Sequence, residues 1–346
     1  MLRRSLALAL LSVACSSSDD STPGSSSGTT PPNDGSVVGD VRESITWEDG
    51  TKLGGVIRVV EGVTVTIAPG AKISCNEATQ ILLGGTLKVS AKDNHASISC
   101  AKWTGITVAK NGKLDIDGLD IENANIGYQT TQDAGECVVK NSKILTTIRP
   151  VEVGVKSKLT LDHVEASVPA VVQGIAVKSF VEVFGTLEAR YLKYEAQTNE
   201  GIMVHTNAEA TITDSELTAH GGQDLISSYG AKSLNVSYTT MAGAHCGLHL
   251  QEADSAVIDR VTSTANLFGI TIYGAKVATV TNSNLSGSLA WLDLRGDHGE
   301  ITFDNNFVAP TAANTPPNAI QENTDPLAKD GRATEAIPDA APRPAP

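Results

Sequence analysis

The sequence predicts an all-β solenoid, in which one chain winds through short strands that stack turn upon turn. Three observations support this prediction. Short apolar units recur at a period of about 22–24 residues, apolar and polar residues alternate within the repeats, and no long segment has the 3.6-residue period of an amphipathic helix. A repeat of this length buries its apolar face only by stacking on its neighbours. Because no long segment has the period of a helix, helical crossovers between the strands are excluded.

The N-terminal residues have the three parts of a secretory signal peptide. A basic head at 3–4 precedes an apolar run at 6–13 and the small residues Ala14 and Cys15. About 8 apolar residues are too few to span a hydrocarbon core about 30 Å thick. Residues 1–15 resemble a bacterial lipoprotein signal, except that the leucine expected three residues before the cysteine lies four before it. The resemblance implies a lipid on Cys15, and the alternative is an ordinary signal peptide with an incidental cysteine.

Composition divides the rest of the chain. Residues 16–37 are mainly Ser, Gly, Pro and Asp, which predicts a disordered tether. Residues 38–53 are expected to cap the first turn, and the repeats extend over 54–311 as one domain. Residues 312–346 are expected to cap the last turn and to end in a disordered tail without a strand or helix pattern.

The repeated unit is Gly–apolar–X–apolar, which we expect to form one strand of each turn. The complete units are GITV at 105–108, GIAV at 174–177, GIMV at 201–204, GLHL at 247–250 and GITI at 269–272, and the degenerate ones are GYQT at 127–130, DLIS at 224–227 and WLDL at 291–294. Other stretches, such as 277–282, alternate apolar and polar residues and are rich in β-branched side chains, which is typical of strands.

A short polar residue ends the next apolar run of each repeat. Asn and Asp tolerate left-handed backbone and hydrogen-bond to local amides, which predicts bends between strands and not catalytic groups. The predicted bend residues are Asp117, Asn141, Asp162, Asp214, Asp259, Asn282 and Asp304, with Arg190 and Ser237 in the turns between.

This pattern resembles the parallel β-helix class, the pectate-lyase-like solenoids, over 54–311. The resemblance lies in the repeat and not in a family-specific motif. It implies a single-stranded right-handed parallel β-helix of about eleven three-strand turns, stacked about 4.8 Å apart. In this register the two Tyr-Gly-Ala-Lys stretches that begin at Tyr229 and Tyr273 lie at one corner, two turns apart.

Two cysteines support the register. Ile-Ser-Cys occurs at 73–75 and again at 98–100, one turn later. Stacking would place the Cα atoms of Cys75 and Cys100 within disulfide range, and an exported protein meets an oxidising compartment. A disulfide is therefore predicted here in preference to free thiols. Cys137 and Cys246 fall at different phases and are expected to be buried and unpaired.

Charge and composition limit the partners. The formal net charge of −13 argues against nucleic acid and against unaided binding of polyanions. Aromatic residues make up only 4% of the chain, so few ring faces are available to bind sugars. Acidic bends are compatible with calcium, but the nonapeptide of calcium β-rolls is absent, and no cofactor is predicted.

No catalytic motif of the known β-helix enzymes is complete. The Trp-Ile-Asp-His stretch of pectate lyases is replaced by WLDL at 291–294, the Gly-His-Gly of polygalacturonases by DHG at 297–299, and the Asp-Pro-His of alginate epimerases does not occur. The weak catalytic candidates are His205, His220, His245, His249 and Asp224.

These histidines have a competing interpretation as surface or turn residues. His205 and His220 lie at different phases of the repeat, so no metal triad is predicted. His249 is expected to point outward in a column with Met203, Ile226, Thr271 and Asp293.

Two functions remain open. The first is an exported, lipid-anchored protein of the cell envelope, placed at the outer membrane, that acts as a non-catalytic adhesion or glycan-contacting module. Its partners would be the membrane, through the lipid, and a polysaccharide or another envelope protein. The alternative is a divergent extracellular polysaccharide lyase or glycoside hydrolase. The turns are short and even in length, so few residues are left to form the walls of a catalytic groove. This favours the non-catalytic module.

Overall fold

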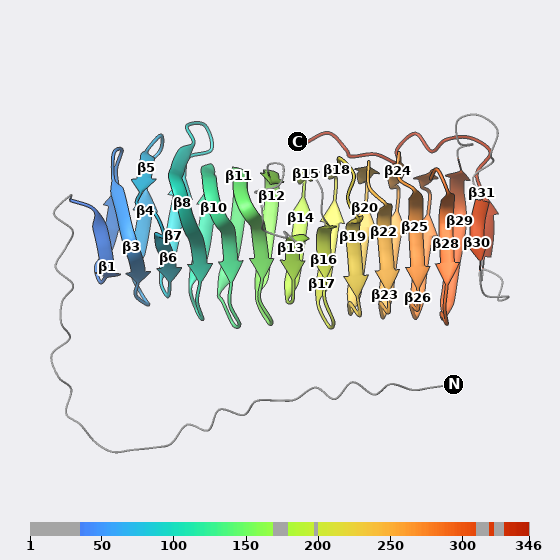
Figure 1. Ribbon diagram of the computed structural model, residues 1–346, viewed down its shortest axis with the longest axis horizontal. Helices are drawn as coiled ribbons and strands as arrows, with labels where there is room; N and C mark the ends of the chain where they lie inside the picture. Colours follow the sequence, from blue (N-terminus) through green and yellow to red (C-terminus); the bar gives the residue numbers. More distant parts are fainter. Residues whose placement is uncertain (1–34, 169–178, 197–199, 309–317, 322–328, 346) are drawn as a thin grey trace, which may run out of the picture. The chain divides into compact units, whose positions relative to one another are not determined.

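The chain folds as an all-β parallel solenoid of about eleven turns, as predicted (Figure 1). The computed structural model describes residues 35–168, 179–196, 200–308, 318–321 and 329–345, and these contain strands, turns and bends but no helix. None of the described residues therefore forms a helix that could cross a membrane. The expected signal peptide at 1–15, nearly all of the tether and the GIAV unit lie outside the described residues.

Each turn contributes to three stacks of parallel strands. The first stack comprises β1 (Val37–Val41), β3 (Lys52–Val59), β6 (Gln80–Leu83), β8 (Ala96–Val108), β10 (Leu119–Thr130), β11 (Glu136–Val153), β13 (Ser179–Val183), β16 (Glu200–Val204), β19 (Asp224–Tyr229), β22 (Cys246–Gln251), β25 (Phe268–Tyr273), β28 (Ala290–Arg295) and β30 (Asn318–Gln321).

The second stack comprises β2 (Ile45–Trp47), β4 (Thr64–Ile67), β7 (Thr86–Ser90), β9 (Lys113–Asp117), β11, β12 (Lys158–Val168), β14 (Thr186–Arg190), β17 (Glu209–Thr213), β20 (Ser233–Ser237), β23 (Ser255–Asp259), β26 (Val277–Thr281), β29 (Glu300–Val308) and β31 (Lys329–Arg332). The third comprises β5 (Lys72–Cys75), β15 (Lys193–Ala196), β18 (Glu216–Ala219), β21 (Thr240–Ala242), β24 (Thr262–Thr264), β27 (Asn284–Leu285) and parts of the long strands β3, β8, β10, β11, β12 and β29.

The two ends extend the repeat. β1 pairs in parallel with β3, and β2 pairs with β4, so that 37–47 forms a turn of the coil where a cap was expected. Trp47 is buried in the core of this turn. At the other end β30 pairs with β28 and β31 with β29, which carries the strand pairing past 311. The strands β1 and β2 at one end, and β30 and β31 at the other, therefore cover the apolar ends of the repeats that were predicted over 54–311.

The core is a column of apolar side chains, as the period predicts. Ile202, Leu248 and Ile270 fall in the same register of the first stack, and each is fully buried. The unit at 224–227 is one residue out of the expected register, because Ile226, and not Leu225, pairs with Ile202. Two consecutive apolar residues at this point made the pattern ambiguous by one position.

The left-handed bend residues were predicted correctly in part. Asn141, Asp214 and Asn282 have positive φ angles of 44°, 51° and 50°. In the other turns the left-handed position falls one residue after the predicted Asp, Arg or Ser. The residues there are Gly118, His163, Tyr191, Tyr238, Arg260 and Asn305.

Stacked polar groups explain why unusual residue types occupy these bends. The hydroxyls of Ser215 and Ser283 accept hydrogen bonds at 3.1 Å from the backbone N–H groups of Leu192 and Val261 on the preceding turn. The backbone N–H groups of Tyr191 and Arg260 donate to the Thr213 and Thr281 carbonyls on the next turn at 3.2 and 3.1 Å. Because neighbouring turns satisfy the bend in this way, its conformation does not depend on an Asn or Asp at the left-handed position.

The predicted Cys75–Cys100 disulfide is confirmed. The two residues are register partners on β5 and β8, with Cα atoms 5.1 Å apart. Closing a loop over 25 residues restricts the unfolded chain and stabilises the fold by roughly 3 kcal/mol. Cys137 and Cys246 are buried and free, as expected.

The last residues run back along the coil. The segment 333–345, here called the C-terminal strap, contains no strand or helix, but it contacts several turns (Figure 1). The backbone N–H and carbonyl of Ile337 bond to the Asn284 amide at 2.7 and 2.9 Å. The Arg343 guanidinium meets the buried Asp214 carboxylate through two bonds of 2.6 and 2.7 Å. This part of the expected tail is therefore held against the solenoid.

The Arg343–Asp214 pair makes strap attachment dependent on pH. Burial alone would raise the pKa of Asp214, but hydrogen bonds and charge from Arg343, with the charge of Arg190, bring it below its ordinary value. A carboxyl whose folded pKa is depressed stabilises the folded state above its unfolded pKa near 4, and this contribution is lost as the pH falls through the folded pKa.

We therefore expect Arg343→Ala to detach the strap at neutral pH. Acidification through the depressed pKa of Asp214, which lies below its ordinary value near 4, should do the same in the unsubstituted chain. Hydrogen exchange of the strap amides should accelerate, with little change in the melting temperature of the coil. Lys276→Ala, which breaks the exposed pair with Asp254, is the control. Unchanged exchange in the Arg343 variant would show that the ion pair does not hold the strap.

Candidate functional site

A groove lies on the outward face of the first stack, over β19, β22, β25 and β28. Its volume is about 690 Å³. The lining residues are Glu200, Gln223, Asp224, Tyr229, His245, Cys246, His249, Gln251, Phe268, Thr271, Tyr273, Leu289, Asp293 and Arg295. This groove gathers three of the five candidate residues together with aromatic rings and carboxylates.

Three columns of side chains build this groove, because parallel stacking repeats each strand position one turn later. Asp224, Cys246 and Phe268 are register partners at the start of the strands. His249, Thr271 and Asp293 follow one another in the middle. The column at the strand ends comprises Tyr229, Gln251, Tyr273 and Arg295.

The middle column corrects one predicted neighbour of His249. Ser227, and not Ile226, is the register partner of His249, while Thr271 and Asp293 occupy the positions expected for them. Ser227 is fully buried, and its hydroxyl has no hydrogen-bond partner among the described residues. The column is therefore more polar than the sequence pattern indicated.

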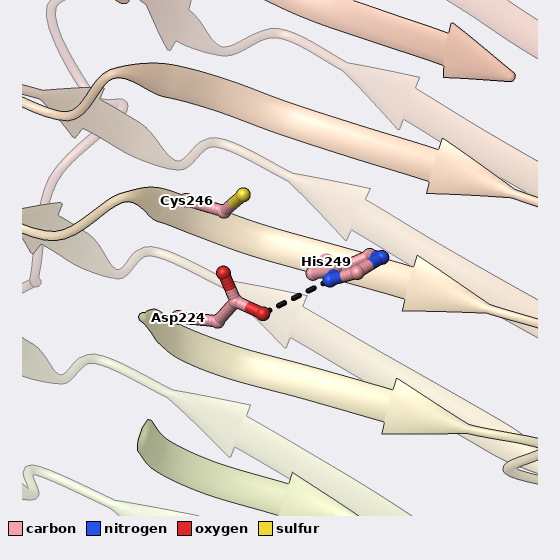
Figure 2. Close-up of side chains that lie close together, drawn as sticks. All are labelled: Asp224, Cys246 and His249. Carbon is pink, nitrogen blue, oxygen red and sulfur yellow. Dashed lines mark hydrogen bonds and ion pairs between the residues drawn. The ribbon is translucent and has the colours of Figure 1, made fainter. Parts of the chain in front are cut away.

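Asp224, Cys246 and His249 converge at one wall of the groove (Figure 2). His249 Nδ1 lies 2.9 Å from a carboxylate oxygen of Asp224. One ligand atom from each of the three residues lies within 4.8 Å of the other two. Asp224 and Cys246 are 6% and 3% exposed, whereas the His249 ring is partly open to the groove.

The rim of this cluster holds two further polar groups. His245 Nδ1 lies 3.3 Å from Cys246 Sγ and 3.9 Å from the other oxygen of Asp224. Thr271 Oγ1 lies 3.4 Å from the same sulfur. The thiol is thus surrounded by hydrogen-bonding groups although it is almost completely buried.

The environment keeps the Cys246 thiol protonated. Burial, followed by the negative charge of Asp224, raises its pKa far above the ordinary value of a cysteine, and the Thr271 hydroxyl offsets only part of this rise. A thiol, unlike a thiolate, is a poor nucleophile. The arrangement of these groups therefore does not support nucleophilic catalysis by Cys246 alone.

The other two candidate histidines lie elsewhere. His205 stacks on Phe184 with ring centroids 4.0 Å apart, and its pKa is lowered, chiefly by burial. His220 bonds to Glu195 at 2.7 Å beside a different hollow of about 600 Å³ over β15 and β18. The charges in that hollow belong largely to ion pairs such as Lys143–Glu165. Neither histidine belongs to the groove.

Sequence reasoning missed Cys246 as a member of the site. A usable signal was present, because Asp224 and Cys246 are 22 residues apart, one period of the repeat. Asp293 also lies in the groove, where one of its oxygens accepts a 2.7 Å hydrogen bond from Arg295. This aspartate came from the degenerate WLDL unit.

Two of the three carboxylates that line the groove, Asp224 and Asp293, lie far apart. Asp224 and Asp293 belong to strands three turns apart, or about 14 Å along the stack at 4.8 Å per turn. Glycoside hydrolysis needs two carboxyl groups roughly 5 to 9.5 Å apart. This pair is therefore too widely separated for that mechanism.

Comparison of the chain with protein-family models, curated proteins and solved structures gave no match.

Proposed function

We propose that the protein is a non-catalytic, glycan-contacting module of the cell envelope, and that it binds a neutral polysaccharide segment along the groove over β19 to β28. The observation behind this proposal is the column of Tyr229, Gln251, Tyr273 and Arg295 at the strand ends. It alternates aromatic rings with planar hydrogen-bonding groups. The two Tyr-Gly-Ala-Lys stretches of the sequence supply its two tyrosines.

The geometry of this column suits a chain of sugar rings. Tyr229 and Tyr273 are two turns apart, or about 9.6 Å at 4.8 Å per turn. One pyranose unit advances a polysaccharide by nearly one strand spacing, so alternate sugars can stack on the two rings while Gln251 and Arg295 bond to hydroxyls. Tyr273 is 43% exposed, which leaves its ring available.

The charge of the groove favours neutral sugars. Glu200, Asp224 and Asp293 line it with carboxylates, and Arg295 is the one arginine or lysine among the groove residues named above. A polymer of uronic acids would meet net repulsion there, whereas a neutral glycan would not. The acidic composition of the whole chain acts in the same direction.

Export and anchoring form the second part of the proposal. The signal-like residues 1–15 and the Ser/Gly/Pro-rich tether at 16–37 support a lipid on Cys15, which would hold the groove at a distance from the outer membrane. Membrane fractionation of cells that express the Cys15→Ser variant tests this part. A variant that stayed in the membrane fraction would exclude the lipid anchor.

Binding is tested with neutral and acidic glycans by calorimetry in the presence of a chelator. Tyr273→Ala is expected to weaken binding of the best neutral glycan roughly three- to tenfold, because one aromatic contact is lost. Tyr273→Phe, which keeps the ring, should bind nearly normally, and Val257→Ala on the second stack is a control for exposed apolar surface.

Two results would count against the proposal. Absence of binding to every glycan would exclude the module, and so would equal binding by the Tyr273→Ala variant. Release of reducing or unsaturated ends would instead favour the alternative, a divergent hydrolase or lyase. The hydrogen-bonded Asp224–His249 pair is the feature that supports this alternative, because it resembles an oriented acid–base pair.

A further inference from the structure

We propose that Asp224, Cys246 and His249 form a binding site for a zinc-class divalent cation in the wall of the groove, with the fourth coordination position open to the groove. The proposal does not rest on the proposed binding of glycan, although the site lies in the same groove. The ligand atoms are a carboxylate oxygen of Asp224, Sγ of Cys246 and Nδ1 of His249. The three side chains lie close together in Figure 2, where Asp224 and His249 are in direct contact.

The set of donor atoms selects the type of cation. A cysteine sulfur beside an imidazole nitrogen suits zinc and related borderline transition metals, whereas calcium and magnesium prefer oxygen ligands alone. Three protein ligands with one open position are typical of catalytic zinc sites, and four of structural sites. The cluster therefore indicates an accessible zinc site and not a calcium site.

The distances are compatible with tetrahedral coordination after small side-chain rotations. Zinc bonds of about 2.0 to 2.3 Å place neighbouring ligand atoms roughly 3.3 to 3.7 Å apart. The carboxylate and the imidazole nitrogen are now 2.9 Å apart in a direct hydrogen bond, and no pair among the three ligand atoms exceeds 4.8 Å. A cation between them would replace that hydrogen bond with two coordination bonds.

The backbone fixes the ligand positions. Asp224 and Cys246 are direct register partners on β19 and β22, and His249 follows three residues later on the same strand as Cys246. Ligands on adjacent strands of a hydrogen-bonded sheet are held more rigidly than ligands on loops. Burial of Asp224 and Cys246 also excludes water from all but the open side of the site.

The charge balance of the site is favourable. On binding, the Cys246 thiol gives its proton to solvent, and His249 carries its remaining proton on Nε2 so that Nδ1 is free to coordinate. Thiolate and carboxylate then offset the two positive charges of the cation. The resulting complex carries no net charge, and the cation supplies the stabilisation that a thiolate lacks in the empty site.

Metal uptake by the purified full chain tests the proposal. The protein is first treated with a chelator without reductant, so that the Cys75–Cys100 disulfide stays intact, and is then titrated with Zn²⁺ or Co²⁺ alone. We expect one equivalent to bind, and Co²⁺ to give the near-ultraviolet absorption of a sulfur–cobalt bond. Cys246→Ser should abolish this absorption, and Asp224→Asn should weaken affinity at least about tenfold.

Cys137→Ser is the matched control, because Cys137 is also a buried free cysteine but lies on β11, outside the groove. It should bind like the unsubstituted chain. His249→Gln, checked for folding by circular dichroism, provides a second ligand variant and should also lose affinity.

Failure to bind one equivalent, or sulfur–cobalt absorption that survives in Cys246→Ser, would overturn the proposal. Because this experiment contains no glycan and the glycan experiment contains a chelator, each proposal can fail without the other.

Discussion

Gly243→Ala is expected to destabilise the coil by about 4 kcal/mol, whereas Gly221→Ala should cost only about 1 kcal/mol. The two glycines occupy adjacent turns, and the Gly221 N–H donates to the Gly243 carbonyl at 3.1 Å. Both have left-handed backbone, with φ angles of 87° and 80°. The conformational cost of adding a Cβ is therefore the same at the two positions.

The surroundings of the new methyl group distinguish the two substitutions. A Cβ on Gly243 would lie 2.0 Å from the carbonyl oxygen of Ala219, whereas a Cβ on Gly221 would have no atom within 4 Å. Ala219 ends β18, so its carbonyl cannot move away without disturbing the third stack. Relief of the overlap must displace sheet backbone, which is among the mechanisms that produce the largest losses of stability.

Urea denaturation of both variants measures the difference, and hydrogen exchange in β18 and β21 shows whether the damage is local. A loss of about 1 kcal/mol in both variants would mean that the backbone adjusts without cost. In that case steric contact between turns would not limit which residues the bends accept.

The stacking of the fold was predictable because it depends on local patterns that repeat. Period and alternation placed Ile202, Leu248 and Ile270 correctly, and one period also placed Cys75 over Cys100. The register failed by one residue at 224–227, where adjacent apolar residues fit two alignments. A repeat fixes the average spacing, but the local bend decides which of two neighbours points inward.

Contacts made by a segment outside the repeat, which packs against the side of the coil, could not be predicted. Nothing in the composition of 333–345 indicates that Arg343 lies against Asp214, 129 residues earlier in the chain. The candidate site could be predicted from the sequence only in part. His245, His249 and Asp224 were identified, but the convergence of Cys246 on them requires the register between β19 and β22.

Leu248→Ala is expected to destabilise the coil by about 3 to 4 kcal/mol, the usual range for a leucine whose removal leaves a cavity. The Leu248 side chain is fully buried between Ile226 and Ile270 of the adjacent turns, and both of these are held by strand pairing above and below. The stack cannot collapse into the space because the turn spacing is set by backbone hydrogen bonds. Val257→Ala, at a 42% exposed position, should change stability by less than about 0.5 kcal/mol.

Double substitutions test whether energetic coupling in this coil is confined to neighbouring turns. Leu248→Ala and Ile270→Ala affect adjacent turns and share one cavity, so their combined cost should differ from the sum by about 0.5 kcal/mol or more. Ile57 is buried eight strand pairings away from Leu248, so Ile57→Ala and Leu248→Ala should add within about 0.5 kcal/mol. Urea denaturation of the single and double variants gives both coupling energies. Strong coupling between the distant pair would contradict the nearest-neighbour description of the solenoid, because stability would then be shared along the whole stack.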